Sequence, residues 1–269
     1  MPSPQITSLQ NQRVKDAAKL RERRQRDKQQ RILIDGLREL RRAIEAGVEL
    51  CEVFVCEALC RGDEARQLLD LLASTSAEIL PVTPAVFAKL AFGERAEGVL
   101  GVAKTPAARL EKLKLGADAL VAVVEGIEKP GNLGAVLRSA DAAGLSAVIA
   151  AGHGVDLYSP NVIRASLGTI FTLPVTTATA EEALQWLAER NFHIFAARVD
   201  AAQIYTDVSY TGAAAIVLGS EAEGLSSVWQ GENVTPIKLP MCGAADSLNI
   251  SAAAAILFYE ALRQRGKGP

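Results

Sequence analysis

The segment 119–126 (ALVAVVEG) restricts the possible folds more than any other part of this sequence. It lacks the alternation of polar and apolar side chains that marks a strand with one face in water. A continuous apolar strand is typical of a parallel sheet whose two faces are both covered by helices. Similar runs at 146–152, 192–197 and 213–220 alternate with helical patterns. The sequence therefore predicts a doubly wound parallel α/β sheet.

The same pattern extends to the rest of the chain. In the second half, further strands are expected at 171–175 and 233–240, and helices at 129–144, 180–190 and 248–264. In the first half, short apolar runs again alternate with helical patterns, which predicts a separate α/β unit of about 100 residues. Its expected strands are 32–34, 50–56, 78–82 and 98–104, and its expected helices are 36–47, 63–76 and 84–91.

These patterns divide the chain into two domains. Residues 1–105 form a smaller N-terminal domain, residues 106–117 a polar linker, and residues 118–269 the larger C-terminal domain. No uncharged apolar run reaches about 18 residues, so no membrane span is expected. The N-terminus also lacks the apolar stretch of a secretory signal peptide.

The cysteine pattern favours a reducing compartment and no metal centre. With two histidines and no CxxC pair, the chain offers no obvious zinc ligands, and no metal is expected. Free thiols in the cytoplasm are the simpler interpretation. The residues concerned are Cys51, Cys56, Cys60 and Cys242.

The basic side chains are concentrated near the N-terminus. The net charge of the chain is −2, yet residues 13–42 hold 12 basic and 5 acidic side chains. Residues 5–30 are expected to form one polar, basic helix. Such a helix can be a solvated surface with internal ion pairs, but its acids are too few to neutralise it. The local charge favours RNA contact by Arg13, Lys19, Arg21, Arg23, Arg24, Arg26 and Lys28.

Three segments of the C-terminal domain follow expected strands and differ from ordinary loops. They are residues 128–144, 216–226 and 237–265. In an open α/β sheet, ligands bind beyond the carboxyl ends of the strands. None of the segments carries the GxGxxG pattern of a dinucleotide-binding fold, which disfavours a nucleotide-dependent reductase.

Each segment carries polar side chains that could bind or orient a ligand. Asn132 is a possible N-cap, with Arg138 in the helix after it, and Glu221 lies between two glycines. Ser247 and Asn249 lie at an expected helix N-terminus, beside its free N–H groups. Taken singly, each feature also fits a capped helix or a polar turn.

Together and in this order, the three segments resemble the signature motifs of the SpoU (TrmH-like) RNA 2′-O-ribose methyltransferases of the SPOUT superfamily. The matching stretches are NLGAVLRSADAAG, IVLGSEAEGLS and LPMCGAADSLNISAAAA. The stretch YSPNVIRASLGTIFTLPV at 158–175 looks like the family's segment between motifs. The resemblance covers most of 118–269, and the N-terminal part is similar to the substrate-binding domain that many members carry.

The resemblance implies a parallel-sheet SPOUT fold with a C-terminal trefoil knot, a rare exception to ordinary chain connection. It also implies S-adenosylmethionine as methyl donor and a homodimer through the knotted domain. The residues that fall on catalytic positions are Asn132, Arg138, Glu221, Ser247 and Asn249. Those that fall on the cofactor pocket are Leu218, Gly219, Ile237, Leu239, Met241 and Leu248.

The implied reaction is methyl transfer to a ribose 2′-hydroxyl of structured RNA. The two-domain layout resembles members that act on 23S ribosomal RNA more than the compact transfer-RNA enzymes. A transfer-RNA 2′-O-methyltransferase and a non-catalytic RNA-binding or ribosome-assembly protein are the alternatives. Arg138 could act as a general base only if its pKa were depressed, because guanidinium groups ordinarily stay protonated. Clamping a phosphate and stabilising charge on the 2′-oxygen is the preferred role.

Overall fold

The computed structural model describes residues 4–92, 97–152, 155–220 and 223–266. It divides into two compact units, residues 1–107 with 156–172, and residues 108–155 with 173–269. No pattern in the sequence indicates that the chain returns to the first unit at 156–172. The domain limits expected from sequence, with a linker at 106–117, stay predictions.

The second unit is built on a parallel sheet, which confirms the predicted α/β fold. Within the described residues it has seven strands in the order β7-β6-β5-β10-β8-β11-β9. Every pairing between neighbouring strands is parallel. The strands are β5 (Leu120–Glu125), β6 (Ala147–Ala151), β7 (Val175–Ala178), β8 (His193–Ala197), β9 (Gln203–Ile204), β10 (Ala214–Leu218) and β11 (Val234–Lys238).

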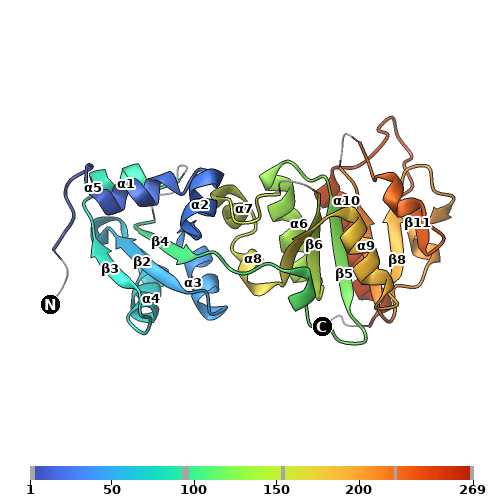
Figure 1. The fold of residues 1–269 in the computed structure, drawn as a ribbon, viewed down its shortest axis with the longest axis horizontal. Helices are drawn as coiled ribbons and strands as arrows, with labels where there is room; N and C mark the ends of the chain where they lie inside the picture. The colour runs from blue at the N-terminus through green and yellow to red at the C-terminus, as the bar shows by residue number, and fades with distance from the viewer. Residues whose placement is uncertain (1–3, 93–96, 153–154, 221–222, 267–269) are drawn as a thin grey trace. The chain divides into compact units, whose positions relative to one another are not determined.

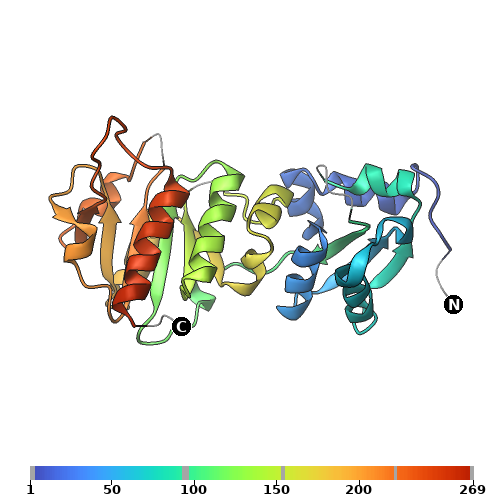
Figure 2. The same cartoon turned by 180° about the vertical axis from the view of Figure 1, so that it is seen from behind.

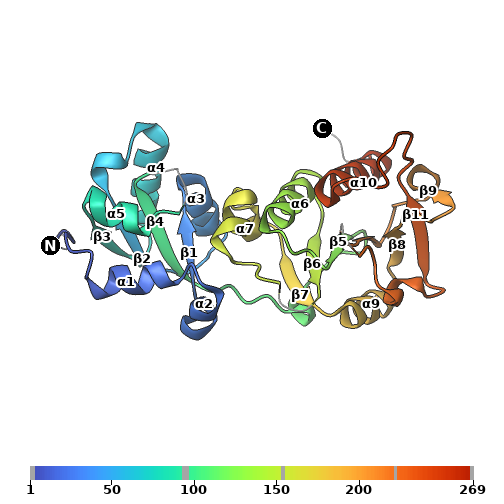
Figure 3. The same ribbon diagram turned by 90° about the horizontal axis from the view of Figure 1, so that it is seen from above.

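Helices cover both faces of this sheet. Helices α6 (Pro130–Ala142) and α10 (Ile250–Gln264) lie side by side on one face (Figure 2), and α9 (Ala180–Ala188) lies on the other (Figure 3). The side chains of β10 and of β5 up to Val124 are buried, as their apolar sequences require. The layers leave the carboxyl ends of the strands as the place where loops can build a site.

In the described part of the first unit, four strands form a sheet in the order β1-β4-β2-β3. β4 is antiparallel to β1 and β2, whereas β2 and β3 are parallel. Helices α3 (Leu37–Glu45) and α4 (Gly62–Leu72) lie on one face, and α1 (Gln12–Lys19) and α5 (Pro84–Leu90) on the other (Figure 1). The strands are β1 (Arg31–Asp35), β2 (Leu50–Val55), β3 (Glu78–Pro81) and β4 (Val99–Lys104).

The expectation of one basic helix over 5–30 is wrong. Helix α1 ends at Lys19, and α2 (Arg23–Gln29) begins after a break at Leu20. The Leu20 side chain is buried in the core under α1 and α5. The Arg26 guanidinium donates to the main-chain oxygens of Leu20 and Arg21, which the break leaves without helical partners.

The expected strand at 171–175 is displaced. Residues Thr169–Thr172 form the short helix α8, and the strand β7 begins only at Val175. Pro174 explains where α8 ends, because the residue before a proline is disfavoured in the helical region. Together with α7 (Pro160–Ala165), α8 packs against α3 and β1 of the first unit.

The polar stretch 105–117 carries more structure than expected. It forms a 3-10 turn at Leu110–Lys112, and Leu110 is buried in the core beneath α9. Leu113 and Leu115 also pack against that core. All four cysteines are free thiols. None of the helices in the described ranges has the length and hydropathy of a membrane crossing.

A cluster of ionisable groups is buried at the end of β1. The Asp35 carboxylate accepts a hydrogen bond from the main-chain N–H of Phe92 at 2.5 Å. Burial raises the pKa of Asp35 to about 6, against the smaller lowering effects of that hydrogen bond and of Arg164. Burial likewise raises the pKa of Glu39, and Glu97 adds negative charge beside both carboxyls.

Replacing Asp35→Asn should stabilise the first unit at neutral pH. The folded state holds the Asp35 proton up to about pH 6, whereas the unfolded state releases it near pH 4. As the pH rises from about 4 to about 6, the wild type therefore loses stability, because the unfolded state can release this proton and the folded state cannot. The variant should be more stable at pH 7.5 by about 1–3 kcal/mol, with little difference near pH 3.5.

Urea unfolding at both pH values measures this effect. Circular dichroism is the signal to follow, because both tryptophans lie in the second unit and their fluorescence would not report on the first. An equal difference between variant and wild type at the two pH values would show that Asp35 does not titrate as described.

Candidate functional site

The main chain folds back closely on itself where β10 ends. A Cβ atom at Gly219 would lie 2.2 Å from the carbonyl carbon of Gly224 and 2.5 Å from the N of Leu225. Next to this contact, Ser220 and Gly224 exchange two main-chain hydrogen bonds of 3.2 and 3.0 Å. Only glycine fits at 219, so its place in the second motif has a direct steric cause.

Helix α6 begins at Pro130, two residues before the expected cap at Asn132. Its N-cap is Lys129 and Pro130 occupies the first turn, where the ring fixes a helical φ and no N–H is lost from the ladder. The expectation that Asn132 caps the helix is therefore wrong. Asn132 lies inside the first turn, half-buried, and Arg138 lies further along the same helix.

Asn249 caps α10 and reaches the first turn of α6. Its side-chain oxygen accepts from the N–H and the hydroxyl of Ser251, at 3.0 and 2.6 Å. Its amide nitrogen donates to Oδ1 of Asn132 at 3.4 Å. The structure thus brings together the first and third motifs, which are 117 residues apart.

The Arg138 side chain is exposed. Among the described residues, its guanidinium has no hydrogen-bond or ion-pair partner in the protein. It is therefore available for a ligand such as a phosphate, which a guanidinium binds through paired N–H groups. Glu221, the remaining catalytic candidate, lies outside the described residues.

A cavity of about 540 Å³ opens at the carboxyl ends of β8, β10 and β11. This volume is in the range of small-molecule sites. Five of the six residues expected to hold a cofactor line it, together with Ser247 from the catalytic candidates. These five are Leu218, Gly219, Leu239, Met241 and Leu248.

Ile237 is the exception, and its assignment to the pocket is corrected. Its side chain is fully buried, and its main chain pairs with β8 and β9. The Ile237 carbonyl accepts a hydrogen bond from the N–H of Arg198 at 2.8 Å. Both the side chain and the carbonyl are thus engaged within the sheet.

The segment after β8 is part of the cavity, and the sequence motifs missed it. Arg198, Val199 and Asp200 all line the cavity, and Val199 is 73% exposed. The rule that ligands bind beyond strand ends would have indicated these residues, because 192–197 is readily recognised as a strand. What the sequence lacks is any sign that this strand lies next to β10.

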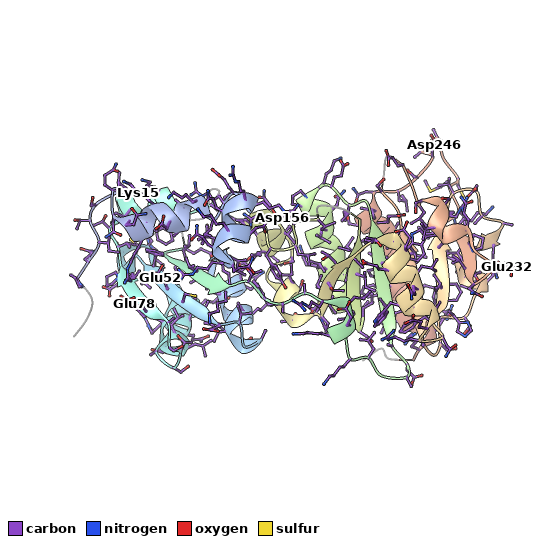
Figure 4. All side chains as sticks on the ribbon, in the orientation of Figure 1. Lys15, Glu52, Glu78, Asp156, Glu232 and Asp246 are labelled. Atoms are coloured by element: carbon purple, nitrogen blue, oxygen red, sulfur yellow. The ribbon has the colours of Figure 1, made fainter. Side chains whose placement is uncertain are left out.

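Carboxylates dominate the charge of the cavity lining. Asp200, Glu223 and Asp246 are the acids and Arg198 is the one basic residue among the described lining residues; Figure 4 labels Asp246 between β11 and α10. Arg198 donates to both carboxylate oxygens of Asp200, at 2.9 and 2.8 Å. These hydrogen bonds hold the pKa of Asp200 below its usual value. The cavity therefore favours a ligand with positive charge.

The basic residues near the N-terminus differ in how much of their charge is free. Arg26 is 4% exposed and pairs with Asp156. Its assignment to an RNA surface is therefore corrected, because its charge is buried within the first unit. Arg13 bridges to Glu78 at 2.7 Å and lies 3.7 Å from Glu52 on the neighbouring strand. Figure 4 labels both glutamates. Lys19 pairs with Asp16 at 3.0 Å.

The other basic residues of this stretch are exposed. Arg21 donates to two main-chain oxygens near the end of α5, and Arg23 lies 3.6 Å from Asp27. Arg24 and Lys28 have no partner among the described residues. These two carry the charge of α2 that remains available to a polyanion.

Two family models match this chain. The model of the SpoU rRNA Methylase family matches residues 119–259, and that of the MRM3-like substrate binding domain matches residues 11–101. A curated relative, a 23S rRNA (uridine(2479)-2′-O)-methyltransferase of Streptomyces viridochromogenes, is 31% identical over 93% of this chain and 89% of its own length.

Solved structures share the whole fold. A crystal structure of an RNA 2′-O ribose methyltransferase has a TM-score of 0.85 and 45% identity over 97% of this chain and 99% of its own. The SpoU methyltransferase AviRb from Streptomyces viridochromogenes, crystallised with AdoMet, has a TM-score of 0.86 and 28% identity over 97% of this chain and 100% of its own.

The substitution Gly219→Ala should destabilise the second unit. The added methyl group would collide with main-chain atoms of residues 224 and 225, and overpacking of this kind costs about 1–3 kcal/mol. Gly231→Ala is the matched control, because nothing lies within 4 Å of a Cβ there. Its effect should stay within about 0.5 kcal/mol.

Urea unfolding followed by the fluorescence of the buried Trp229, in the turn after this loop, measures both variants. Equal stabilities of the two variants would mean that the close approach at Gly219 is not maintained in solution.

Proposed function

The chain belongs to the SpoU rRNA Methylase family, and we propose that it transfers a methyl group from S-adenosylmethionine to a ribose 2′-hydroxyl of 23S ribosomal RNA. The observation that carries the proposal is the cavity at the carboxyl ends of β8, β10 and β11. It lies beside the Asn132–Asn249 contact, since its lining residues Leu248 and Ile250 flank Asn249. It is also built from the residues that the family resemblance assigned to the methyl donor.

The residues present fit this methyl donor. Apolar side chains of Leu218, Leu239 and Met241 offer a face for a planar base. The carboxylates of the lining suit a ligand that carries a sulfonium and an ammonium group.

Bound in this cavity, S-adenosylmethionine supplies a methyl group that its sulfonium charge has already activated. The protein must hold the ribose oxygen in line with the methyl carbon at about 3–3.5 Å and exclude water. We assign the clamping of the substrate phosphate to Arg138, whose guanidinium is exposed. Its positive charge also stabilises the negative charge that develops on the 2′-oxygen.

The other catalytic candidates receive supporting roles in the proposal. Asn132 and Asn249 hold each other across the starts of α6 and α10, and thereby set the place of the ribose relative to Arg138. Ser247, on the cavity wall, is placed to donate a hydrogen bond to either reactant. Glu221 is assigned to orienting a basic group, as the resemblance implies.

A homodimer and a trefoil knot in the C-terminal part complete the proposal. Ala252, Ile256 and Tyr259 are exposed on α10 at a spacing that places them on one face. An exposed apolar helix face of this kind supports packing against a second copy. The proposed ribosomal RNA substrate places the protein in the cytoplasm.

A methyl-transfer assay tests the reaction. Purified protein and labelled S-adenosylmethionine are offered ribosomal RNA and transfer RNA separately. Label should enter ribosomal RNA and resist alkaline cleavage, and Arg138→Ala should lower kcat by about a hundredfold or more. S-adenosylmethionine affinity should be unchanged, because Arg138 does not line the cavity.

Other outcomes of the assay have distinct meanings. Label in transfer RNA alone would overturn the substrate. Cofactor binding without transfer to either RNA would favour a role in RNA binding or ribosome assembly. A shifted pH–rate profile for Arg138→Lys would contradict a purely positional role of the arginine.

RNA binding by α2 should depend on Arg24 and Lys28. Replacing both with alanine should weaken RNA binding and reduce the slope of log K against log salt by about 1.4–1.8, since each phosphate contact contributes about 0.7–0.9. The measurement is a salt titration of RNA affinity, with S-adenosylmethionine affinity as the internal reference.

Arg13→Ala is the matched control, because its charge is already paired with Glu78. It should change the slope less than either single substitution at Arg24 or Lys28. An unchanged slope in the double variant would remove α2 from the RNA surface.

A further inference from the structure

The last residue of the central strand β5 holds the loop that follows its neighbour β10. Glu125 stands at the carboxyl end of β5, and its two carboxylate oxygens accept from Ser226, 101 residues later. The main-chain N–H of Ser226 donates to one oxygen at 2.9 Å, and its hydroxyl donates to the other at 2.8 Å. Hydrogen bonds to an ionised carboxylate are among the strong ones in proteins.

The residue after Glu125 lies near the other end of the same loop. Gly126 has a φ of +64°, and a Cβ there would lie 3.3 Å from the Cβ of Ser220. Its N–H is held by the carbonyl of Ala151 in β6, which fixes its place in the sheet. Glu125 therefore binds the loop at Ser226, before the turn Ser227–Gln230, and Gly126 lies near Ser220, where the loop leaves β10.

Between these contacts, the described part of the loop is held together internally. Ser220 and Gly224 form an antiparallel bridge, and the Ser220 hydroxyl accepts from the N–H of Glu223 at 3.1 Å. Gly219 also packs closely on the main chain of Gly224 and Leu225. Five described residues of this segment line the cavity: Gly219, Ser220, Glu223, Gly224 and Leu225.

We propose that Glu125 is a positioning residue for the methyl-donor pocket, acting through its paired hydrogen bonds to Ser226. It does not line the cavity itself. By holding the far end of the loop against β5, it keeps one wall of the cavity in the shape that binds S-adenosylmethionine. Glu125 is half-exposed, so its role lies in the loop and not in the core. This inference rests on the proposed function of the pocket.

The test compares S-adenosylmethionine affinity with RNA affinity and stability in the full chain. Glu125→Ala should raise the dissociation constant for S-adenosylmethionine about tenfold, as expected from losing hydrogen bonds to a charged group. The KM for RNA and the melting temperature should change little, because the Glu125 side chain is half-exposed and is not one of the candidate RNA contacts. Isothermal titration calorimetry, steady-state kinetics and thermal unfolding give the three readouts.

Two further variants separate positioning from a general structural role. Glu125→Gln keeps one oxygen acceptor for the Ser226 N–H, and its amide can donate to the Ser226 hydroxyl, so affinity should return to within about threefold of wild type. Ser226→Ala keeps the main-chain N–H and should weaken binding less than Glu125→Ala. The double variant Glu125→Ala with Ser226→Ala should be no weaker than Glu125→Ala alone, because both changes remove the same interaction.

Unchanged S-adenosylmethionine affinity in Glu125→Ala would overturn the inference, as would additive effects in the double variant. If Glu125→Ala fails to fold, the S-adenosylmethionine affinities of Glu125→Gln and Ser226→Ala are compared. A lower affinity in Glu125→Gln than in Ser226→Ala would overturn the inference. Failure of the proposed function is seen separately in the wild type. A wild type that binds S-adenosylmethionine but methylates no RNA refutes the reaction and leaves the positioning role standing, whereas one that binds none refutes both.

Discussion

Close main-chain packing at the carboxyl end of β10 is the contact on which the candidate site depends. At Gly219 the chain leaves the centre of the sheet and returns within a few residues, so close to itself that no side chain fits. This contact is possible because β10 lies between β5 and β8 in a sheet that helices cover on both faces. Parallel strands end at a common edge, and loops from neighbouring strands meet there. The cavity is the space that these loops enclose.

The site is assembled from segments that are far apart in the chain. Asn132 and Asn249 touch although 117 residues separate them, and Glu125 reaches Ser226 across 101 residues. Asn132 and Asn249 lie where α6 and α10 begin, and Glu125 lies where β5 ends. At such ends main-chain groups are left free to bind a side chain. The loops thus owe their shape to the order of the strands, and the chemistry of the pocket follows from which side chains that order brings together.

Much of this could be predicted from the sequence. The apolar runs located five strands of the second unit within a few residues, whereas β7 is displaced near Pro174 and the two-residue strand β9 was not expected. The motifs located most of the cavity lining. Three kinds of error remained. Arg26 was grouped with surface cations because charge alone does not reveal burial. Ile237 was placed in the pocket, although its strand turns it into the sheet. Arg198 and Asp200 were missed because only the strand order brings them beside Gly219.

The sequence by itself determined what depends on near neighbours in the chain: the buried strands, the cap at Asn249 and the need for glycine at 219. These follow from local sterics and hydrogen bonding, and a short segment carries the whole signal. The tertiary structure decided which charges are free and which are paired, which strand ends adjoin, and that Ser226 is held by Glu125. Burial and partnership arise between residues distant in the chain, so no local pattern records them.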